Sequence, residues 1–86
     1  MATVHIGAAL RGEIGGLAQV QAAGSTLREV VQDLERQFPG FGARIIDAAG
    51  IRPEVMVAVA NDEVRSPDVA VGPETEVYIL PAIAGG

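Results

Sequence analysis

Alternating apolar and polar residues near the N-terminus predict the first strands of a sheet. In the run TVHIGAAL, every second position from Val4 to Leu10 is apolar, and this period of two is typical of a strand with one buried face. The run LAQVQA follows the glycine-rich segment RGEIGG. The two runs therefore predict a β-hairpin whose strands are joined by an irregular loop of about six residues.

The pattern then changes to a helical period. In the segment STLREVVQDLERQF, Thr26 and Glu29 have the spacing of a capping box, and the apolar residues form one stripe. The stripe consists of Leu27, Val30, Val31, Leu34 and Phe38. The Pro-Gly pair that follows predicts the end of the helix. The next segment, FGARIID, predicts a short helical turn that places Phe41 and either Ile45 or Ile46 under the sheet.

The second half of the chain returns to strand patterns. The run EVMVAVA predicts a third strand that ends at the turn signal ND. The next residues, EVR, predict a very short edge strand. The segment SPDVAVGPETE predicts a loop, and EVYIL predicts the last strand. Because one helical stripe has to cover the apolar face, the order ββαββ predicts an α+β fold, with a mixed sheet packed on one main helix. We expect the last strand to lie parallel to the first at the sheet centre, which is the β-grasp (ubiquitin-like) arrangement. The expected domain covers residues 1–80, and a flexible tail covers 81–86.

Composition and charge narrow the classes of partner. The 86 residues are 49% hydrophobic, which suits one domain with a modest core. The formal net charge of -5 repels phosphate backbones, so we do not expect the chain to bind nucleic acid. No apolar run is long enough to span a membrane, and no basic segment leads into an apolar stretch at the N-terminus. We therefore expect a cytoplasmic protein that does not enter membranes.

Few residue types in this chain can perform catalysis. The absence of Cys excludes thiol catalysis and a thiolate metal site, and a single histidine, His5, does not assemble a metal centre alone. The sequence shows no partner that would position His5 for catalysis. All six basic residues are Arg, so the α-amino group is the ordinary amine nucleophile. We expect no catalytic residue and no metal site.

The C-terminal sequence VYILPAIAGG is the strongest candidate for a functional segment. Glycine has no side chain, so Gly85 and Gly86 can pass through a narrow enzyme channel in extended form. Strand alternation in EVYIL places Tyr78 and Leu80 on the outward face if Val77 and Ile79 face the helix. We expect Leu80 to be an exposed apolar contact for partners. The full set of expected partner-binding residues is Leu80, Pro81, Ala82, Ile83, Ala84, Val64 and Arg65.

The pattern as a whole resembles the ubiquitin-like sulfur carriers of the MoaD/ThiS family. The resemblance covers the whole chain: the ββαββ order, the helix start T-L-x-E-V, the turn V-A-N-D-E, the segment G-x-E-T-E-V before the last strand and the closing Gly-Gly. Within that family, ILPAIAGG and VVQDLERQFPGFGARIID are most similar to the CysO-type carriers of cysteine biosynthesis.

This resemblance implies a role as a protein substrate, not as an enzyme. An E1-like adenylyltransferase/sulfurtransferase would use ATP to adenylate the carboxylate of Gly86, and sulfur transfer would convert it to a thiocarboxylate. The sulfur would then pass to a substrate held on a PLP-dependent cysteine synthase, and a zinc peptidase of the JAMM type would release the product. The resemblance implies no bound cofactor in the carrier itself, which we expect to be a monomer when free.

Two other functions fit the same sequence pattern. The chain could be the small subunit of molybdopterin synthase, where the same tail inserts into a larger catalytic subunit. It could also be a β-grasp interaction module or protein modifier that is never converted to a thiocarboxylate. Chemistry at the tail separates the last possibility from the first two, and the identity of the partner separates those two from each other.

Overall fold

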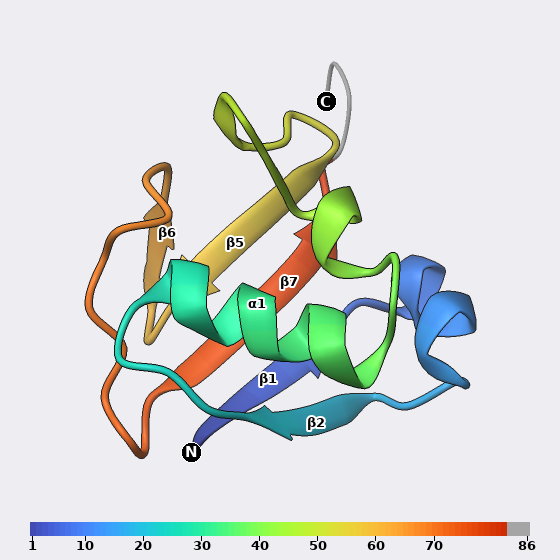
Figure 1. Cartoon of the computed structure of the whole chain (residues 1–86), viewed down its shortest axis with the longest axis horizontal. Coiled ribbons are helices and arrows are strands. Elements are labelled where there is room, and N and C mark those ends of the chain that lie inside the picture. Colours follow the sequence, from blue (N-terminus) through green and yellow to red (C-terminus); the bar gives the residue numbers. More distant parts are fainter. Residues whose placement is uncertain (83–86) are drawn as a thin grey trace.

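The computed structural model describes residues 1–82. Its main elements are a five-stranded sheet and one α-helix that lies across one face of the sheet (Figure 1). Two 3₁₀-helices, η1 and η2, and a small two-stranded sheet complete the fold. The elements are β1 (Ala2–Ile6), η1 (Ala8–Ile14), β2 (Gln19–Ala22), α1 (Leu27–Gln37), η2 (Gly42–Arg44), β3 (Ile46–Asp47), β4 (Gly50–Ile51), β5 (Val55–Val59), β6 (Asp62–Val64) and β7 (Glu76–Pro81).

The strand order confirms the β-grasp arrangement. The sheet runs β2-β1-β7-β5-β6, and β7, the last strand in the sequence, lies in its middle. Strand β7 is parallel to β1 and antiparallel to β5, so the sheet is mixed. The β1–β2 and β5–β6 pairs are antiparallel hairpins. Because β1 and β7 are parallel, the N-terminus and the end of β7 lie at opposite ends of the sheet (Figure 1).

Alternation along the central strands produces the core. In β1 and β7, residues facing α1 are buried, and their neighbours in sequence are half-buried or exposed. The predicted helix stripe is buried as well, except for Phe38, which packs at the core margin. The buried residues are Ala2, Val4, Ile6, Leu10, Ile14, Val20, Ala22, Leu27, Val30, Val31, Leu34, Phe41, Ile45, Val55, Val57, Val71, Val77 and Ile79.

The start of α1 confirms the predicted cap. Thr26 is the N-cap residue, and its Oγ1 accepts a hydrogen bond of 3.2 Å from the backbone N–H of Glu29. The Glu29 carboxylate reaches back to accept a bond of 2.8 Å from the backbone N–H of Ser25. This bond is the main reason why the pKa of Glu29 is lowered. The first bond satisfies an N–H group that the helix leaves unpaired at its start, and the second ties the residue before the N-cap to the first turn.

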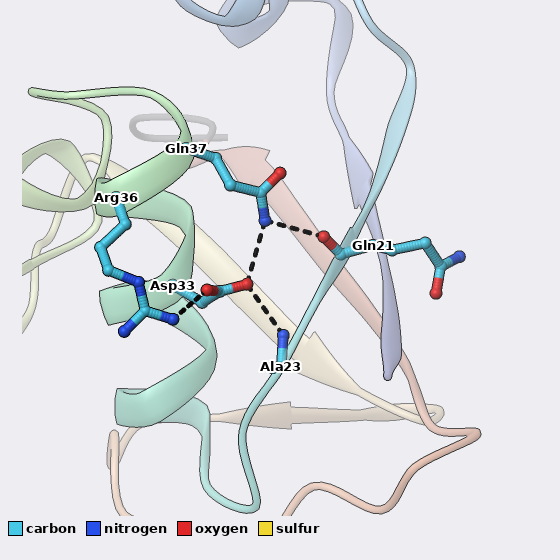
Figure 2. A network of polar contacts seen from close by, with 5 residues as sticks. All are labelled: Gln21, Ala23, Asp33, Arg36 and Gln37. Atoms are coloured by element: carbon cyan, nitrogen blue, oxygen red, sulfur yellow. Dashed lines mark hydrogen bonds and ion pairs between the residues drawn. The ribbon is translucent and has the colours of Figure 1, made fainter.

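Asp33 joins the middle of α1 to the end of β2, as Figure 2 shows. Its carboxylate accepts hydrogen bonds from the backbone N–H of Ala23 at 2.9 Å and from the side-chain amide of Gln37 at 3.0 Å, and it pairs with Arg36. The same Gln37 amide donates to the backbone carbonyl of Gln21 at 2.8 Å. The pKa of Asp33 is lowered, first by the Ala23 N–H and then by Arg36. The ionised carboxylate therefore stabilises the packing of α1 beside β2.

The first strand is shorter than expected, and the loop after it is helical. Strand β1 ends at Ile6, where the alternation predicted a strand up to Leu10. The N–H of Leu10 donates to the carbonyl of Gly7 at 2.9 Å, which begins the turn of η1. Leu10 and Ile14 both point into the core from η1. The prediction of a strand up to Leu10 was wrong because apolar residues three or four positions apart also suit a helical turn. Strand β2 likewise begins after Leu17, which is exposed.

A small hairpin between residues 46 and 51 was not expected. Strands β3 and β4 pair Ile46 with Ile51, and both side chains pack at the margin of the core. Each strand has two residues, too few to show a period of two. The turn before the hairpin agrees with the prediction, because η2 is a single helical turn and Phe41 and Ile45 beside it are buried.

Candidate functional site at the base of the C-terminal tail

Pro81 and Ala82 form the base of the tail, and both are fixed to the sheet. Pro81 is the last residue of β7 and pairs with Val55, so the strand continues one residue past the expected domain end at 80. The backbone N–H of Ala82 donates a 2.8 Å hydrogen bond to the carbonyl of Glu54. The other expected tail residues, Ile83, Ala84, Gly85 and Gly86, lie outside the described residues.

Leu80 lies on the outward face of the sheet as expected, but it is half-buried. Its partner in the register is Met56, which is on the same face. A Cβ built on Gly7 would come within 3.2 Å of Leu80 Cδ2, so the leucine side chain lies against the backbone of Gly7. The missing side chain at position 7 explains why Leu80 is less exposed than expected. The exposed large apolar residues of the described chain are Met1 and Leu17.

Val64 lies on the other face of the sheet from Leu80. It pairs with Val57, which is fully buried on the side of α1. Leu80 pairs with Met56, the residue before Val57 in the same strand, and successive residues of a strand face opposite sides. Val64 and Leu80 therefore do not form one apolar patch. The sequence shows which residues alternate, but the register that decides the face comes from strand pairing.

A groove of about 390 Å³ brings three of the expected residues together. Val64, Arg65 and Ala82 all line it, at the sheet edge where β6 ends. The groove is also lined by the segment 51–53, from the end of β4 onward, and by the start of β5. The groove thus adjoins the base of the tail, and Arg65 lines the same groove as Ala82.

Two arginines of different character line this groove. Arg52 Nη2 lies 2.8 Å from Glu54 Oε2, and Asp47 is 4.0 Å away. The Arg52 hydrogen bond is the main cause of the lowered pKa of Glu54, and the bond in turn raises the pKa of Arg52. Arg65 is 87% exposed, and its guanidinium lies 3.9 Å from Glu63. One guanidinium is therefore held beside the base of the tail, and the other projects into solvent.

His5 has a carboxylate partner that the sequence did not reveal. Its Nε2 lies 2.7 Å from Glu76 Oε1, and its ring stacks on Tyr78 with centroids 4.5 Å apart. The parallel pairing of β1 with β7 brings together residues 71 positions apart, which no local spacing can show. Tyr78 precedes Pro81 by three residues of extended strand, so the stack lies roughly 10 Å from the base of the tail. His5 and Tyr78 therefore form part of the outward face of the sheet, away from the base of the tail.

Several carboxylates within residues 1–82 pair with backbone N–H groups or arginines. Glu35, for example, accepts hydrogen bonds from the N–H groups of Gly40 and Gly42 at 2.7 and 2.8 Å. These acids and His5 do not gather into groups of three or more that could hold a metal ion in the described part of the chain. No helix in that part is long and apolar enough to cross a membrane.

Comparison with known proteins matches both the sequence and the fold. A model of the ThiS family matches residues 4–86. The sulfur carrier protein CysO of Mycobacterium tuberculosis is 36% identical over 90 residues, which cover 98% of this chain and 97% of that protein. The CysO of Mycobacterium bovis matches with the same identity and coverage.

Solved structures give the same picture. The CysO of the BexX/CysO complex from Amycolatopsis orientalis matches with a TM-score of 0.91 and 32% identity over 100% of both chains. Mycobacterium tuberculosis CysO matches with a TM-score of 0.88 and 32% identity, covering 96% of this chain and 100% of the other. The small archaeal modifier protein 1 of Methanosarcina acetivorans has a TM-score of 0.82 at 18% identity, over 99% of this chain and 95% of its own, and shares the fold.

Proposed function

The chain belongs to the ThiS family, and we propose that it is a sulfur carrier protein whose terminal Gly86 carboxylate is converted to a thiocarboxylate. The observation that carries the proposal is the 36% identity to the CysO carrier along almost the whole of both chains. The base of the tail supports it, because the central strand of the sheet leads directly into the terminal segment. In this role the chain is a substrate of other enzymes, not a catalyst.

Activation has to make an unreactive carboxylate open to attack by sulfur. A Gly86 carboxylate oxygen attacks the α-phosphorus of ATP, pyrophosphate leaves, and a mixed anhydride with AMP remains. Hydrosulfide, released by a sulfur source, then attacks the carbonyl carbon and AMP leaves, so that a thiocarboxylate forms and sulfur replaces one oxygen. The ATP and the groups that bind it belong to an E1-like adenylyltransferase/sulfurtransferase. The carrier needs no cofactor of its own.

The number of residues after the sheet limits how far the terminus can lie from it. Four residues follow Ala82 in the sequence, and a fully extended segment of that length spans about 13–14 Å. An enzyme that reaches the carboxylate must therefore approach the end of β7, beside the groove with Arg52 and Arg65. The two terminal glycines let the last part of this segment enter a narrow channel.

We propose cysteine biosynthesis as the destination of the sulfur. The thiocarboxylate sulfur would attack an activated serine derivative held by a PLP-dependent cysteine synthase, and an acyl shift would leave cysteine in amide linkage to Gly86. A JAMM-type zinc peptidase would then release the amino acid. Support comes from the similarity to the sulfur carrier protein CysO of Mycobacterium tuberculosis. The Amycolatopsis orientalis structure, a complex of CysO with BexX, supports the more general point that a protein of this kind binds a partner. In this scheme PLP and zinc belong to the partner enzymes.

Intact-mass spectrometry tests this function directly. The purified chain is incubated with an E1-like enzyme, ATP and a sulfur source, and a parallel reaction omits ATP. We expect one sulfur to replace one oxygen, and fragmentation should place the change on Gly86. An unchanged mass with an active E1-like enzyme would contradict the proposal. Capture of a cysteine synthase supports the cysteine route, and capture of a molybdopterin-synthase large subunit would replace it with the alternative.

A further inference from the structure

We propose that Gly7 is a positioning residue for the C-terminal tail. In this proposal, the missing side chain at position 7 lets Leu80 and Pro81 lie against the end of β1, and this close approach sets the direction in which the tail leaves the sheet. The proposal rests on the function proposed above, because direction matters only if an enzyme must receive the carboxylate of Gly86.

The contacts around Gly7 are closer than a side chain would allow. A Cβ at this position would lie 2.9 Å from Pro81 Cδ, 3.2 Å from Leu80 Cδ2 and 3.3 Å from Leu80 Cα. Real Cβ atoms essentially never approach another heavy atom within 3.0 Å. The backbone N–H of Gly7 also donates a 2.8 Å hydrogen bond to the carbonyl of Ile79. An alanine would therefore push Pro81 and Leu80 away while its own backbone stays tied to β7.

Backbone conformation does not explain the glycine. Gly7 has φ -61° and ψ 148°, an extended conformation that any L-residue adopts. Gly24, in contrast, has φ 148° and meets atoms of Glu29 and Val30, so the turn before α1 accounts for it. The requirement at position 7 is purely steric. The atoms that impose it belong to Leu80 and to the base of the tail.

The base of the tail is held from two sides. On the side of β1 it contacts Gly7, and on the side of β5 the N–H of Ala82 is bonded to the Glu54 carbonyl at 2.8 Å. Displacement of the Pro81 ring would strain the Ala82 bond, because the two residues are adjacent. Loss of that bond would place the last backbone contact with the sheet farther along the chain from the Gly86 carboxylate. A longer free segment delivers its end less precisely and at a lower effective concentration.

Poor delivery should affect turnover more than binding. A misplacement of about 1 Å at a reacting group can cost on the order of a hundredfold in rate. We therefore expect Gly7→Ala to lower kcat of adenylation by roughly tenfold or more. KM should change less than kcat does, because Leu80 stays on the outward face as an apolar side chain and the rest of that face is unchanged.

Gly12→Ala is the matched control for this experiment. Gly12 lies in η1, and a Cβ there would meet nothing within 4 Å. The first readout is hydrogen exchange of the Ala82 amide by NMR, which needs no partner enzyme. We expect Gly7→Ala to lose protection at Ala82 while core amides of β1 and β7 stay protected. The second readout is steady-state thiocarboxylation. Gly12→Ala should match the wild-type protein in both.

A double variant tests whether the contact with Pro81 is the cause. Pro81→Ala removes Cδ, the atom at 2.9 Å, so Gly7→Ala combined with Pro81→Ala should regain Ala82 protection. Its kcat should return to within about threefold of that of Pro81→Ala alone. If Gly7→Ala alone does not fold, Ala82 protection and kcat are compared between the double variant and Pro81→Ala, and equal values support the positioning role.

The possible outcomes separate this proposal from the proposed function. Wild-type exchange at Ala82 and wild-type kcat in Gly7→Ala would overturn the positioning role, and so would a loss that Pro81→Ala does not relieve. If neither the single nor the double variant folds, Gly7 serves the fold and the proposal is wrong. A wild-type chain that gains no sulfur would refute the proposed function instead. In that case a normal Ala82 exchange rate in Gly7→Ala would also refute the positioning role.

Discussion

The two faces of the five-stranded sheet differ in burial, and therefore in which substitutions they can accept without loss of the fold. The face under α1 is apolar and closed, and Val4, Val57 and Val77 on it are fully buried. The opposite face carries polar and half-buried side chains such as His5 and Tyr78, and no α-helix covers it in the described structure. The face under α1 therefore stabilises the fold, whereas side chains on the opposite face stay partly accessible to solvent. Strand β7 contributes to both faces and also leads into the tail.

Polar pairs on the outward face contribute little to stability. His5 pairs with Glu76, and the side-chain amide of Gln21 donates to Thr3 Oγ1 at 2.9 Å. Solvent-exposed pairs of this kind are typically worth about 0–1 kcal/mol. Substitutions on this face should therefore change contacts with partners, whereas substitutions under α1 should change the free energy of unfolding.

The largest effect is expected from a charge under the sheet. Val31→Asp places a carboxylate at a position that is 4% exposed. Burial of an unpaired charge costs several kcal/mol, against a total stability of about 5 kcal/mol for a domain of this size. We expect an unfolded protein by circular dichroism. The control is Gln32→Asp, at the next, exposed helix position, which should stay folded. A folded Val31→Asp would mean that the closed face is wrongly assigned.

On the outward face, Leu80→Glu should weaken binding to the E1-like enzyme or to the sulfur acceptor by roughly tenfold, since loss of an apolar contact costs on the order of 1–3 kcal/mol. The fold should be largely retained, because Leu80 packs on Gly7 and not in the core. Leu17→Glu, at an exposed position in the loop before β2, is the control. Isothermal titration calorimetry measures the affinities. Unchanged affinity would remove Leu80 from the set of partner contacts.

A smaller effect is expected at the junction of α1 and β2. Asp33→Asn should lower the free energy of unfolding at pH 7 by about 1–2 kcal/mol, because the asparagine loses charge-assisted bonds to Ala23 and Arg36. The folded-state pKa of Asp33 is lowered, so its contribution is present above the unfolded-state pKa of about 4. The contribution is lost as pH falls through the folded-state pKa. Urea unfolding should show the two proteins converging below pH 4 or so, and a constant difference down to low pH would contradict this.

The smallest effect concerns the absence of lysine. Arg65→Lys places an amine in the groove beside the base of the tail, whereas Arg28→Lys places one at the start of α1, where Arg28 pairs with Asp68. During prolonged activation, the amine at position 65 should attack the acyl-adenylate and expel AMP, which leaves an internal amide. Intact-mass spectra should show a minor species that has lost water in Arg65→Lys and not in Arg28→Lys. If both variants lack it, the absence of lysine has no protective role.

Local patterns in the sequence predicted the elements well, and long-range contacts limited the rest. The cap at Thr26 and the parallel central strands follow from residue types and alternation, and both are confirmed. The helical η1 and the small β3–β4 hairpin were missed because short apolar spacings fit more than one conformation. Val64 and Leu80 lie on opposite faces of the sheet, and His5 pairs with Glu76. Both arrangements depend on the register between strands that are distant in the sequence. Such contacts cannot be read from spacing along one strand.

The most direct test separates the tail from the domain by changing the terminus alone. Deletion of Gly86, or addition of one residue after it, should abolish the gain of sulfur with the E1-like enzyme and ATP. The melting temperature should stay nearly unchanged, because the buried apolar residues of the described part of the chain lie within residues 2–79. Intact-mass spectrometry and thermal unfolding on the same samples measure both properties. Sulfur gain by the extended chain without prior trimming would contradict the account.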